Sequence, residues 1–420
     1  MLNLFNMAVT FATAILLAQF LGVQEYGLYS YALSWATLLG IFAKFGIDQI
    51  VVRNIAVYHQ QKDWGRIRGM LQFSILLVIL ASLLCALVTA GAAWLLHHDG
   101  SSARTVLWLV CLLLPLQALV APFGATQQGL GQITLAQIPS LLVTPGVFLT
   151  LVLGAYALTP TARSAYSTIV LQAVALAISL VVAGALLRTG LSRAGRPALL
   201  PKPIYQQRSW LASAVPLILM GSMFMINSNA DILMLGSIVG PAAAGTYKVA
   251  TRGADLLIFS LTVISVPLGP LVARLYAAGE MVRLQRELKR WALLAFFPSA
   301  FLALIFIIKG HWFLALFGAE FVNPETKIVL SILTVAQLIL VAAGPVGLLF
   351  VMSGHERFAA QSLTAGAVLN VVLNAVLIPI WGVRGAAMAT AVSTTLFTFL
   401  LISFSIRRLQ LNPTIFPFRL

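Results

Sequence analysis

The chain has 420 residues, of which 60% are hydrophobic and only 9% are charged. A soluble domain carries about a quarter charged residues, and apolar runs of about twenty residues recur throughout this chain, so a soluble protein is excluded. The net charge of +15 is spread over short loops and forms no basic domain, which excludes a nucleic-acid-binding protein. The composition predicts an all-α polytopic membrane protein in contact with the lipid bilayer.

Twelve hydrophobic segments are each long enough to cross a hydrocarbon core of about 30 Å as a helix. The predicted spans are residues 1–20, 27–50, 69–96, 105–123, 133–158, 165–187, 210–238, 244–273, 290–308, 327–351, 358–380 and 384–405. No charge precedes Glu25, so the first segment lacks the basic region of a signal peptide and is expected to remain as a membrane span.

Lys and Arg are distributed unequally between the two sides of the predicted membrane. Eighteen of the 26 lie on the side that holds the loops after spans 2, 6, 8 and 10 and the C-terminal tail. The positive-inside rule assigns this side to the cytoplasm. We therefore expect both chain termini to be cytoplasmic.

An internal repeat predicts two lobes of six helices each. Residues 21–34 align with residues 239–252. The matched pairs are Gly22 with Gly240, Gly27 with Gly245, and Tyr29 with Tyr247. Parallel repeats of this kind are common in transporters. We expect lobes at 1–187 and 209–406, a basic cytoplasmic linker at 188–208 and a cytoplasmic tail at 407–420.

The sequence contains no pattern that predicts an enzyme. A DxD pair, a phosphate-binding GxxxxGK[ST] loop, HExxH and GxSxG are all absent. The HHDG stretch at 97–100 has no neighbouring Cys or second His pair, so no metal site is predicted. A membrane saccharide polymerase or ligase is the enzymatic alternative, but it would need a large outer loop with catalytic Arg or His. We therefore predict no catalytic residues and a transport function.

Asp231 is the only charged residue between Arg208 and Lys248, and it lies in the predicted seventh span. Asn227 precedes it by four residues, which places both on one helical face. Ionisable residues within membrane spans usually face a partner or a water-filled cavity. Asp231 is expected either to face a cavity, where it binds a cation, a proton or a basic partner, or to form an ion pair with the next helix.

The eighth span carries Lys248, Arg252 and Asp255 on one helical stripe. Two cations against one anion leave a net positive charge, which suits an anionic cargo because Lys and Arg bind phosphate. The alternative is a set of interface anchors whose long side chains reach water.

Lys44, Asp48 and Arg53 end the second span. Lys44 and Asp48 are four residues apart and can neutralise each other, while Arg53 is either an anchor at the inner interface or a cargo contact. Arg274 ends the eighth span in a comparable place. We predict that these four residues contact a diphosphate headgroup at the inner mouth of a cavity, or else mark the membrane surface.

The segment FLGVQEYGLYSYALSWATLLGIFAKFGIDQIVVRNIA resembles the opening of the polysaccharide-biosynthesis flippases. The resemblance rests on an LG-x-x-x-YG-x-Y turn between two helices and on a second helix that ends in a G-x-x-x-x-x-x-R-x-I-A pattern. Here these are Leu21, Gly22, Tyr26, Gly27 and Tyr29, followed by Gly46, Arg53, Ile55 and Ala56. The second lobe resembles the family through Asp231, Leu235, Gly236, Gly245, Tyr247 and Ala250.

This resemblance implies a V-shaped transporter like the multidrug and toxic compound exporters, working by alternating access and carrying no cofactor beyond a coupling H⁺ or Na⁺. It implies a bacterial inner membrane and a cargo of undecaprenyl-diphosphate-linked oligosaccharide, such as an O-antigen repeat unit of lipopolysaccharide or an exopolysaccharide repeat unit. A polysaccharide polymerase and chain-length machinery are the implied partners. The alternative is a cation-coupled multidrug exporter of the same fold, which should have an acidic cavity. The cationic stripe of the eighth span argues against it.

Overall fold

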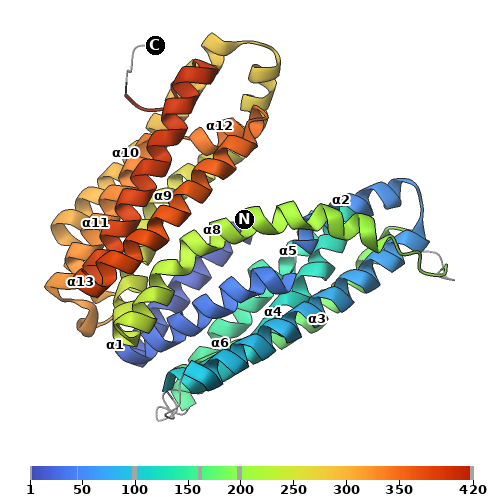
Figure 1. The fold of residues 1–420 in the computed structure, drawn as a ribbon, viewed down its shortest axis with the longest axis horizontal. Helices are drawn as coiled ribbons and strands as arrows, with labels where there is room; N and C mark the ends of the chain where they lie inside the picture. Colours follow the sequence, from blue (N-terminus) through green and yellow to red (C-terminus); the bar gives the residue numbers. More distant parts are fainter. Residues whose placement is uncertain (1, 45, 97–101, 159–162, 196–200, 417–420) are drawn as a thin grey trace. The chain divides into compact units, whose positions relative to one another are not determined.

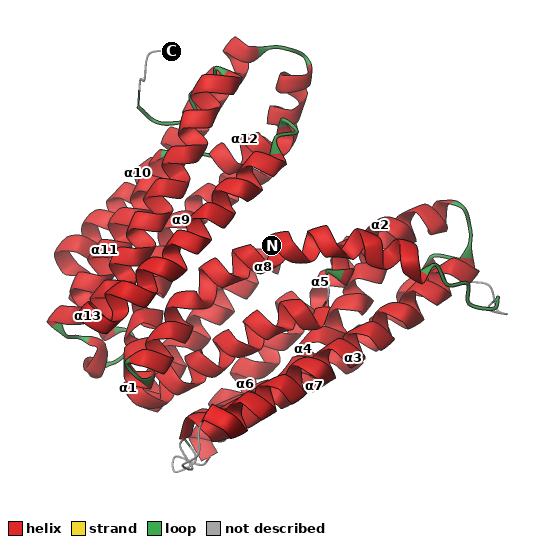
Figure 2. Cartoon of the chain, in the orientation of Figure 1, coloured by secondary structure: helices red, strands yellow, loops and turns green. Residues whose placement is uncertain are grey.

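A computed structural model describes residues 2–44, 46–96, 102–158, 163–195 and 201–416, with side chains described outside 92–107, 208–209, 212–222 and 224. Over these residues the chain is helical with short connections, and no strand occurs in this described part, as Figure 2 shows. The HHDG stretch, part of the predicted linker and the end of the tail lie outside the described residues. An all-α membrane fold is confirmed.

The elements follow one another in a simple order. The α-helices are α1 (Leu2–Lys44), α2 (Ile47–Gln60), α3 (Trp64–Leu96), α4 (Ser102–Gly129), α5 (Ile133–Ile138), α6 (Thr144–Leu158), α7 (Ala165–Arg193), α8 (Gln207–Ile238), α9 (Pro241–Ala277), α10 (Met281–Ala315), α11 (Pro324–Ala342), α12 (Val346–Met352) and α13 (Glu356–Phe404). Short π-helices occupy Pro139–Val143 and Ser405–Leu409, and a 3₁₀ turn occupies Ala319–Phe321.

Nine helical segments of the described residues are long and apolar enough to cross a membrane. Two of them, Leu2–Gln60 and Glu356–Leu409, each contain two predicted spans. The backbone leaves helical angles between those spans at Gly22 and Gly382, where positive φ values favour glycine. The predicted seventh span lies in α8. Ten of the predicted spans lie in helix over their described residues. The predicted span 27–50 is interrupted between α1 and α2, and the predicted span 327–351 is interrupted between α11 and α12.

The chain forms two compact units, residues 1–225 and 226–420, with the division inside α8. In the first unit, α4 packs against α1, α2, α3 and α7. Its core includes Ile50, Ile55, Met70 and Trp210, all of which are buried. The predicted lobe limits at 1–187 and 209–406 stay a prediction.

In the second unit, α10, α11 and α13 run side by side, and α9 contacts all three (Figure 1). Leu284 and Leu288 of α10 pack with Leu268 and Val272 of α9 in a buried cluster. Local sequence sets where α9 begins. Gly240 adopts a φ of 124°, and Pro241 follows at the first helical position, where its missing N–H is not needed.

Positions matched by the predicted repeat behave alike in the two units. Gly22 and Gly240 both have positive φ and both lie between the first and second spans of their unit. Tyr29 donates a hydrogen bond of 2.9 Å to Gln172 in the sixth span of the first unit. The hydroxyl oxygen of Tyr247 lies 2.9 Å from that of Thr390 in the sixth span of the second unit. The three pairs share the same offset in the sequence, as an internal repeat predicts.

The segment 201–206, the second part of the predicted linker, packs on the first unit. The N–H of Ile204 donates to the carbonyl of Gly65 at 3.0 Å, and Arg68 donates to the carbonyl of Pro201 at 3.2 Å. Tyr205 donates to Gln72 at 2.9 Å. The segment is therefore held along α3 and not extended as a free connection.

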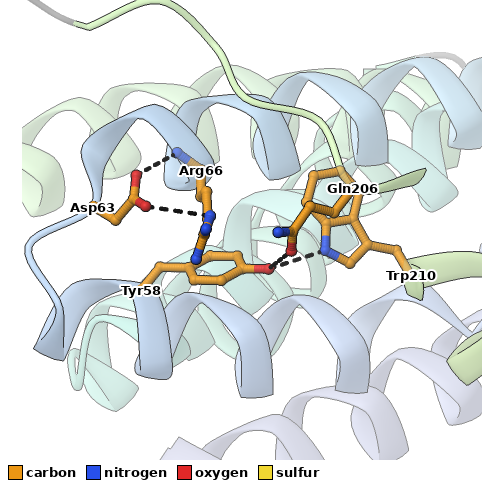
Figure 3. Close-up of polar contacts among 5 residues, drawn as sticks. All are labelled: Tyr58, Asp63, Arg66, Gln206 and Trp210. Atoms are coloured by element: carbon orange, nitrogen blue, oxygen red, sulfur yellow. Dashed lines mark hydrogen bonds and ion pairs between the residues drawn. The ribbon is translucent and has the colours of Figure 1, made fainter. Parts of the chain in front are cut away.

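The end of this segment leads into a polar cluster in which Tyr58 and Trp210 are buried and Gln206 is exposed (Figure 3). Tyr58 donates to Gln206 at 3.0 Å and accepts from the indole N–H of Trp210 at 3.1 Å. Arg66 lies over the Tyr58 ring and pairs with Asp63 at 3.3 Å. These contacts attach the start of α8 to the turn between α2 and α3.

Replacing Gly69 with Ala should displace segment 201–206. A Cβ atom at Gly69 would overlap the carbonyl oxygen of Ile204 and lie 2.8 Å from its carbonyl carbon, and backbone cannot rotate away. We expect a loss of about 1–3 kcal/mol in the free energy of unfolding. Thermal unfolding of the purified protein in detergent measures this loss.

Gly91→Ala on the same helix is the matched control, because a Cβ atom there meets nothing within 4 Å. An equal melting temperature for Gly69→Ala and Gly91→Ala would show that the packing of segment 201–206 contributes nothing to stability.

Candidate functional site

A cavity of about 640 Å³ lies within the first unit. Helices α1, α2, α4, α5, α6 and α7 and the π-helix between α5 and α6 all contribute to it. Its lining residues are Leu33, Lys44, Asp48, Gln49, Val52, Arg53, Leu113, Gln117, Val120, Ala121, Gly124, Ala125, Gln128, Ala136, Ser140, Thr144, Gln172 and Leu176. We call this the first-unit cavity.

Three of the four predicted headgroup residues, Lys44, Asp48 and Arg53, line this cavity. They do not share a continuous helix, because α1 ends at Lys44 and α2 starts only after Gly46, which adopts a left-handed conformation with φ of 61°. No ion pair joins Lys44 to Asp48 in the described structure, and Oδ1 of Asp48 is buried without a hydrogen-bond partner. The three residues therefore form a charged end of the cavity with one excess positive charge.

Uncharged polar side chains that were not predicted from the sequence line the rest of the cavity together with apolar ones. Gln117 and Gln128 lie on α4 and Gln172 lies on α7, where its Oε1 accepts the hydrogen bond from Tyr29. The signal was a stripe of small and amide residues along α4. Gln117, Ala121, Gly124 and Gln128 recur at helical spacing, so they share one face.

The cavity wall includes an irregular helix. Pro139 begins the π-helix, and its carbonyl accepts hydrogen bonds from Ser179 at 2.8 Å and from the Thr144 hydroxyl at 3.0 Å. π-Helical turns are rare and often occur at functional sites. Here the turn places both Ser140 and Thr144 on the cavity lining.

Asp231 forms a second candidate site, inside the second unit. Its side chain is only 6% exposed. Oδ2 accepts hydrogen bonds from Tyr247 at 2.6 Å and from Thr390 at 2.7 Å, and Oδ1 accepts one from Asn374 at 2.5 Å. The carboxylate is therefore held by neutral donors from α9 and α13.

Asn370 extends this group, which we call the Asp231 cluster (Asp231, Tyr247, Asn370, Asn374 and Thr390). Asn374 donates to Oδ1 of Asn370 at 3.0 Å, as expected for residues that share a helical face. Oδ1 of Asn374 is buried and has no hydrogen-bond partner. A buried amide oxygen without a donor indicates room for a further donor or for a cation.

The ion-pair alternative for Asp231 is not realised in the described structure. Neither Lys248 nor Arg252 forms an ion pair with it, and Asn227 makes no hydrogen bond to it although it lies one turn away on α8. Lys248 and Arg252 are half-buried on α9, while Asp255 is exposed. Nε of Arg252 is buried without a hydrogen-bond partner.

Arg274 lies near the end of α9 with an exposed side chain, and it belongs to the second unit. Its predicted pairing with Arg53 at a common cavity mouth stays a prediction. Among the residues that the structure describes, no three His, Cys, Asp or Glu side chains come close enough to hold a metal ion.

Comparison with known families and proteins identifies the group to which the chain belongs. A family model described as polysaccharide biosynthesis protein matches residues 1–275, more than half of the chain. A MatE model matches residues 216–376.

Two curated relatives are archaeal. The probable flippase AglR of Haloferax volcanii is 28% identical over 204 residues, which are 46% of this chain and 40% of the relative. The uncharacterized membrane protein MJ1375 of Methanocaldococcus jannaschii is 24% identical over 210 residues, covering 48% of this chain and 46% of the relative. The chain thus matches less than half of the length of these relatives.

Solved structures share the fold at low identity. An inward-facing multidrug resistance MATE family transporter of the MOP superfamily has a TM-score of 0.72 at 14% identity, covering 95% of this chain and 94% of that chain. The lipid II flippase MurJ in an inward closed conformation has a TM-score of 0.70 at 12% identity, covering 97% and 86%. These matches establish a MATE-like fold. The family-model match over residues 1–275 confirms the predicted resemblance, and the chain is a member of the polysaccharide biosynthesis protein family.

Proposed function

We propose that this protein is a flippase that moves an undecaprenyl-diphosphate-linked oligosaccharide across a bacterial inner membrane by alternating access, driven by an ion gradient. The cargo would be an O-antigen or exopolysaccharide repeat unit. The observation that carries the proposal is the first-unit cavity, which is lined by both polar and apolar side chains, has a net positive charge and lies among membrane-spanning helices.

The charged end of the cavity is suited to a diphosphate. Arg53 and Lys44 offer charge-assisted hydrogen bonds to phosphate oxygens, while Asp48 leaves the site with only one excess positive charge. A positive cavity inside the membrane is costly unless it meets an anion or water. Membership of the polysaccharide biosynthesis family and the flippase name of the Haloferax relative support a lipid-linked saccharide as that anion.

The Asp231 cluster is the site that we propose for the coupling ion, H⁺ or Na⁺. It combines one carboxylate, the unpartnered Oδ1 of Asn374 and the hydroxyl oxygens of Tyr247 and Thr390. Oxygen ligands of this kind suit a hard cation, and the carboxylate alone could accept a proton. Uptake of the ion would neutralise a carboxylate that is otherwise held only by neutral donors.

The excess of Lys and Arg on one side of the membrane supports cytoplasmic termini. With that orientation, the charged end of the first-unit cavity lies on the cytoplasmic side, where lipid-linked repeat units would be available. A polysaccharide polymerase and chain-length machinery would then receive the cargo on the other side.

A cation-coupled multidrug exporter is the second candidate, favoured by the MatE match over residues 216–376 and by the MATE-like fold. The first-unit cavity argues against it. A cationic drug would meet Lys44 and Arg53 there, with Asp48 as the single carboxylate.

The decisive experiment uses cells that lack the gene. Lipid-linked saccharides are extracted and analysed by mass spectrometry, and the same cells are tested against a panel of cationic drugs. Accumulation of one polyprenyl-diphosphate-linked repeat unit with loss of the matching surface polymer supports the flippase and identifies both its sugar and its carrier lipid. Unchanged lipids with new drug sensitivity would overturn it in favour of the exporter.

Replacing both Lys248 and Arg252 with Ala should weaken handling of an anionic cargo. These half-buried cations lie on one stripe of α9, and Nε of Arg252 has no hydrogen-bond partner in the protein. We expect transport to fall about tenfold if a charge-assisted hydrogen bond of roughly 1.5–3 kcal/mol is lost. Complementation of the deletion strain, corrected for membrane abundance, measures the change, and undiminished transport would assign both residues to anchoring.

A further inference from the structure

The lining of the first-unit cavity is charged at one end and uncharged at the other. Its charged end is formed by Lys44, Asp48 and Arg53, and Gln128 lies at the same end, because the adjoining Gly129 packs on Val52 and Ile55 of α2. Gln117 lies eleven residues before Gln128 on α4, which is about 16 Å along the helix axis.

The far part of the cavity has no charged lining residue. Leu33 lies eleven residues before Lys44 on α1, again about 16 Å away. One turn before Leu33, Tyr29 donates to Gln172, which places Gln172 at this same depth. The Tyr29 ring also stacks on Phe148, one turn after Thr144 on α6, which places Thr144 near this depth. We call this part the uncharged end and define it by Leu33, Gln117, Thr144 and Gln172.

The uncharged end presents groups that suit sugar hydroxyls. An amide side chain both donates and accepts hydrogen bonds, as a sugar hydroxyl does. Thr144 adds a hydroxyl oxygen that can accept a hydrogen bond from a sugar, since its own hydrogen is donated to Pro139. Leu33, Leu113 and Leu176 supply apolar surface for the C–H face of a ring. A lipid chain placed here would leave the amides without partners, which costs about 1–3 kcal/mol for each buried polar group.

We infer that the uncharged end is a subsite for the first sugar of the cargo, with a preference for an uncharged sugar, while the diphosphate stays at the charged end. This inference rests on the proposed function. The cargo then lies along the cavity with its first sugar about 16 Å from the charged end that binds the diphosphate. A uronic acid in this subsite would bring a carboxylate to an end that holds no cation, and burying an unpaired charge is strongly unfavourable.

The test measures binding of three soluble probes to the purified protein in lipid nanodiscs by isothermal titration calorimetry. The probes are the methyl ester of a short-prenyl diphosphate, which is the sugar-free probe, the same diester with one neutral hexose in place of methyl, and the same diester with one hexuronic acid in place of methyl. The diphosphate then carries the same charge in all three. We expect the hexosyl probe to bind about tenfold more tightly than the sugar-free probe, as one or two net hydrogen bonds would give. The hexuronosyl probe should bind no more tightly than the sugar-free probe.

Gln117→Leu should lower affinity for the hexosyl probe about fivefold to tenfold and leave the sugar-free probe unaffected. Thr144→Val keeps the side-chain volume and provides a second variant if Gln117→Leu fails to fold. Gln137→Leu is the matched control, because Gln137 is half-buried on α5 but does not line the cavity.

The sugar subsite is overturned if all three probes bind equally. It is also overturned if Gln117→Leu weakens binding of the hexosyl and sugar-free probes by the same factor. In either case the diphosphate site at the charged end is unaffected. Equal affinity for the neutral and acidic sugars would overturn the stated preference. If the wild-type protein binds none of the probes, the proposed function is contradicted. The sugar subsite, which depends on that function, is then contradicted as well.

Discussion

Asp231→Asn should reduce ion-driven transport by at least about tenfold while the protein stays folded and at normal abundance. A hydrogen bond or ion contact to a charged group contributes roughly 1.5–3 kcal/mol, and a tenfold change corresponds to 1.4 kcal/mol. Asn removes the charge that would attract a proton or cation but keeps the size and one acceptor oxygen of Asp.

The surrounding cluster can accommodate this change. The Asn oxygen can still accept from Tyr247 and Thr390, and its new N–H groups can face Asn374 if that amide rotates its unpartnered oxygen toward them. Asp231→Ala would instead remove the acceptor of three donors, and each unsatisfied buried group costs about 1–3 kcal/mol. We therefore expect Asp231→Ala to lose stability as well as transport.

The measurement is uptake of labelled cargo into inverted vesicles with an imposed H⁺ or Na⁺ gradient, and each gradient is tested separately. Glu356→Gln is the matched control, since Glu356 is an exposed carboxylate of the same unit. Full gradient-dependent transport by Asp231→Asn would remove Asp231 from any coupling role and leave the Asp231 cluster as a structural hydrogen-bond network.

Replacing both Lys44 and Arg53 with Gln should weaken binding of a short-prenyl diphosphate about a hundredfold. Each side chain can supply a charge-assisted hydrogen bond worth roughly 1.5–3 kcal/mol, and the two together account for a hundredfold or more. The double variant also leaves Asp48 as the only charge in the cavity lining, so the site changes from net positive to net negative.

Calorimetry at two salt concentrations checks this second prediction. Wild-type binding should weaken as salt rises, because screening acts on the attraction between the cations and the diphosphate. Arg283→Gln is the control, since Arg283 is exposed and pairs with Glu280 in the second unit. If the double variant bound the diphosphate as tightly as the wild type, the charged end would not be the headgroup site.

The candidate sites were only partly predictable. Asp231, Lys44, Asp48 and Arg53 stood out because a charge in an apolar segment is rare and costly. The glutamines of the first-unit cavity did not, because an uncharged amide in a span equally well joins two helices. Their role became visible only when α4 and α7 were seen to face the same space as α2.

The hydrogen-bond partners of Asp231 could not be identified from the sequence either. Its nearest cation in sequence is Lys248, yet its hydrogen bonds come from Tyr247, Asn374 and Thr390. Asn374 and Thr390 are well over a hundred residues away, and helical periodicity reports which residues share a face but not which other helix that face meets.

The sequence by itself determined the membrane spans, the break points at Gly22 and Gly240, and the family. Each of these depends on local chemistry, because apolar length decides whether a segment can cross the bilayer and a positive φ selects glycine. Only the tertiary structure decided which polar groups meet. It joined Lys44, Gln117 and Gln172 in one cavity, enclosed Asp231 among neutral donors, and packed segment 201–206 onto α3. The physical reason is that these contacts depend on how helices distant in sequence pack, and that information lies in pairs of residues and not in any single segment.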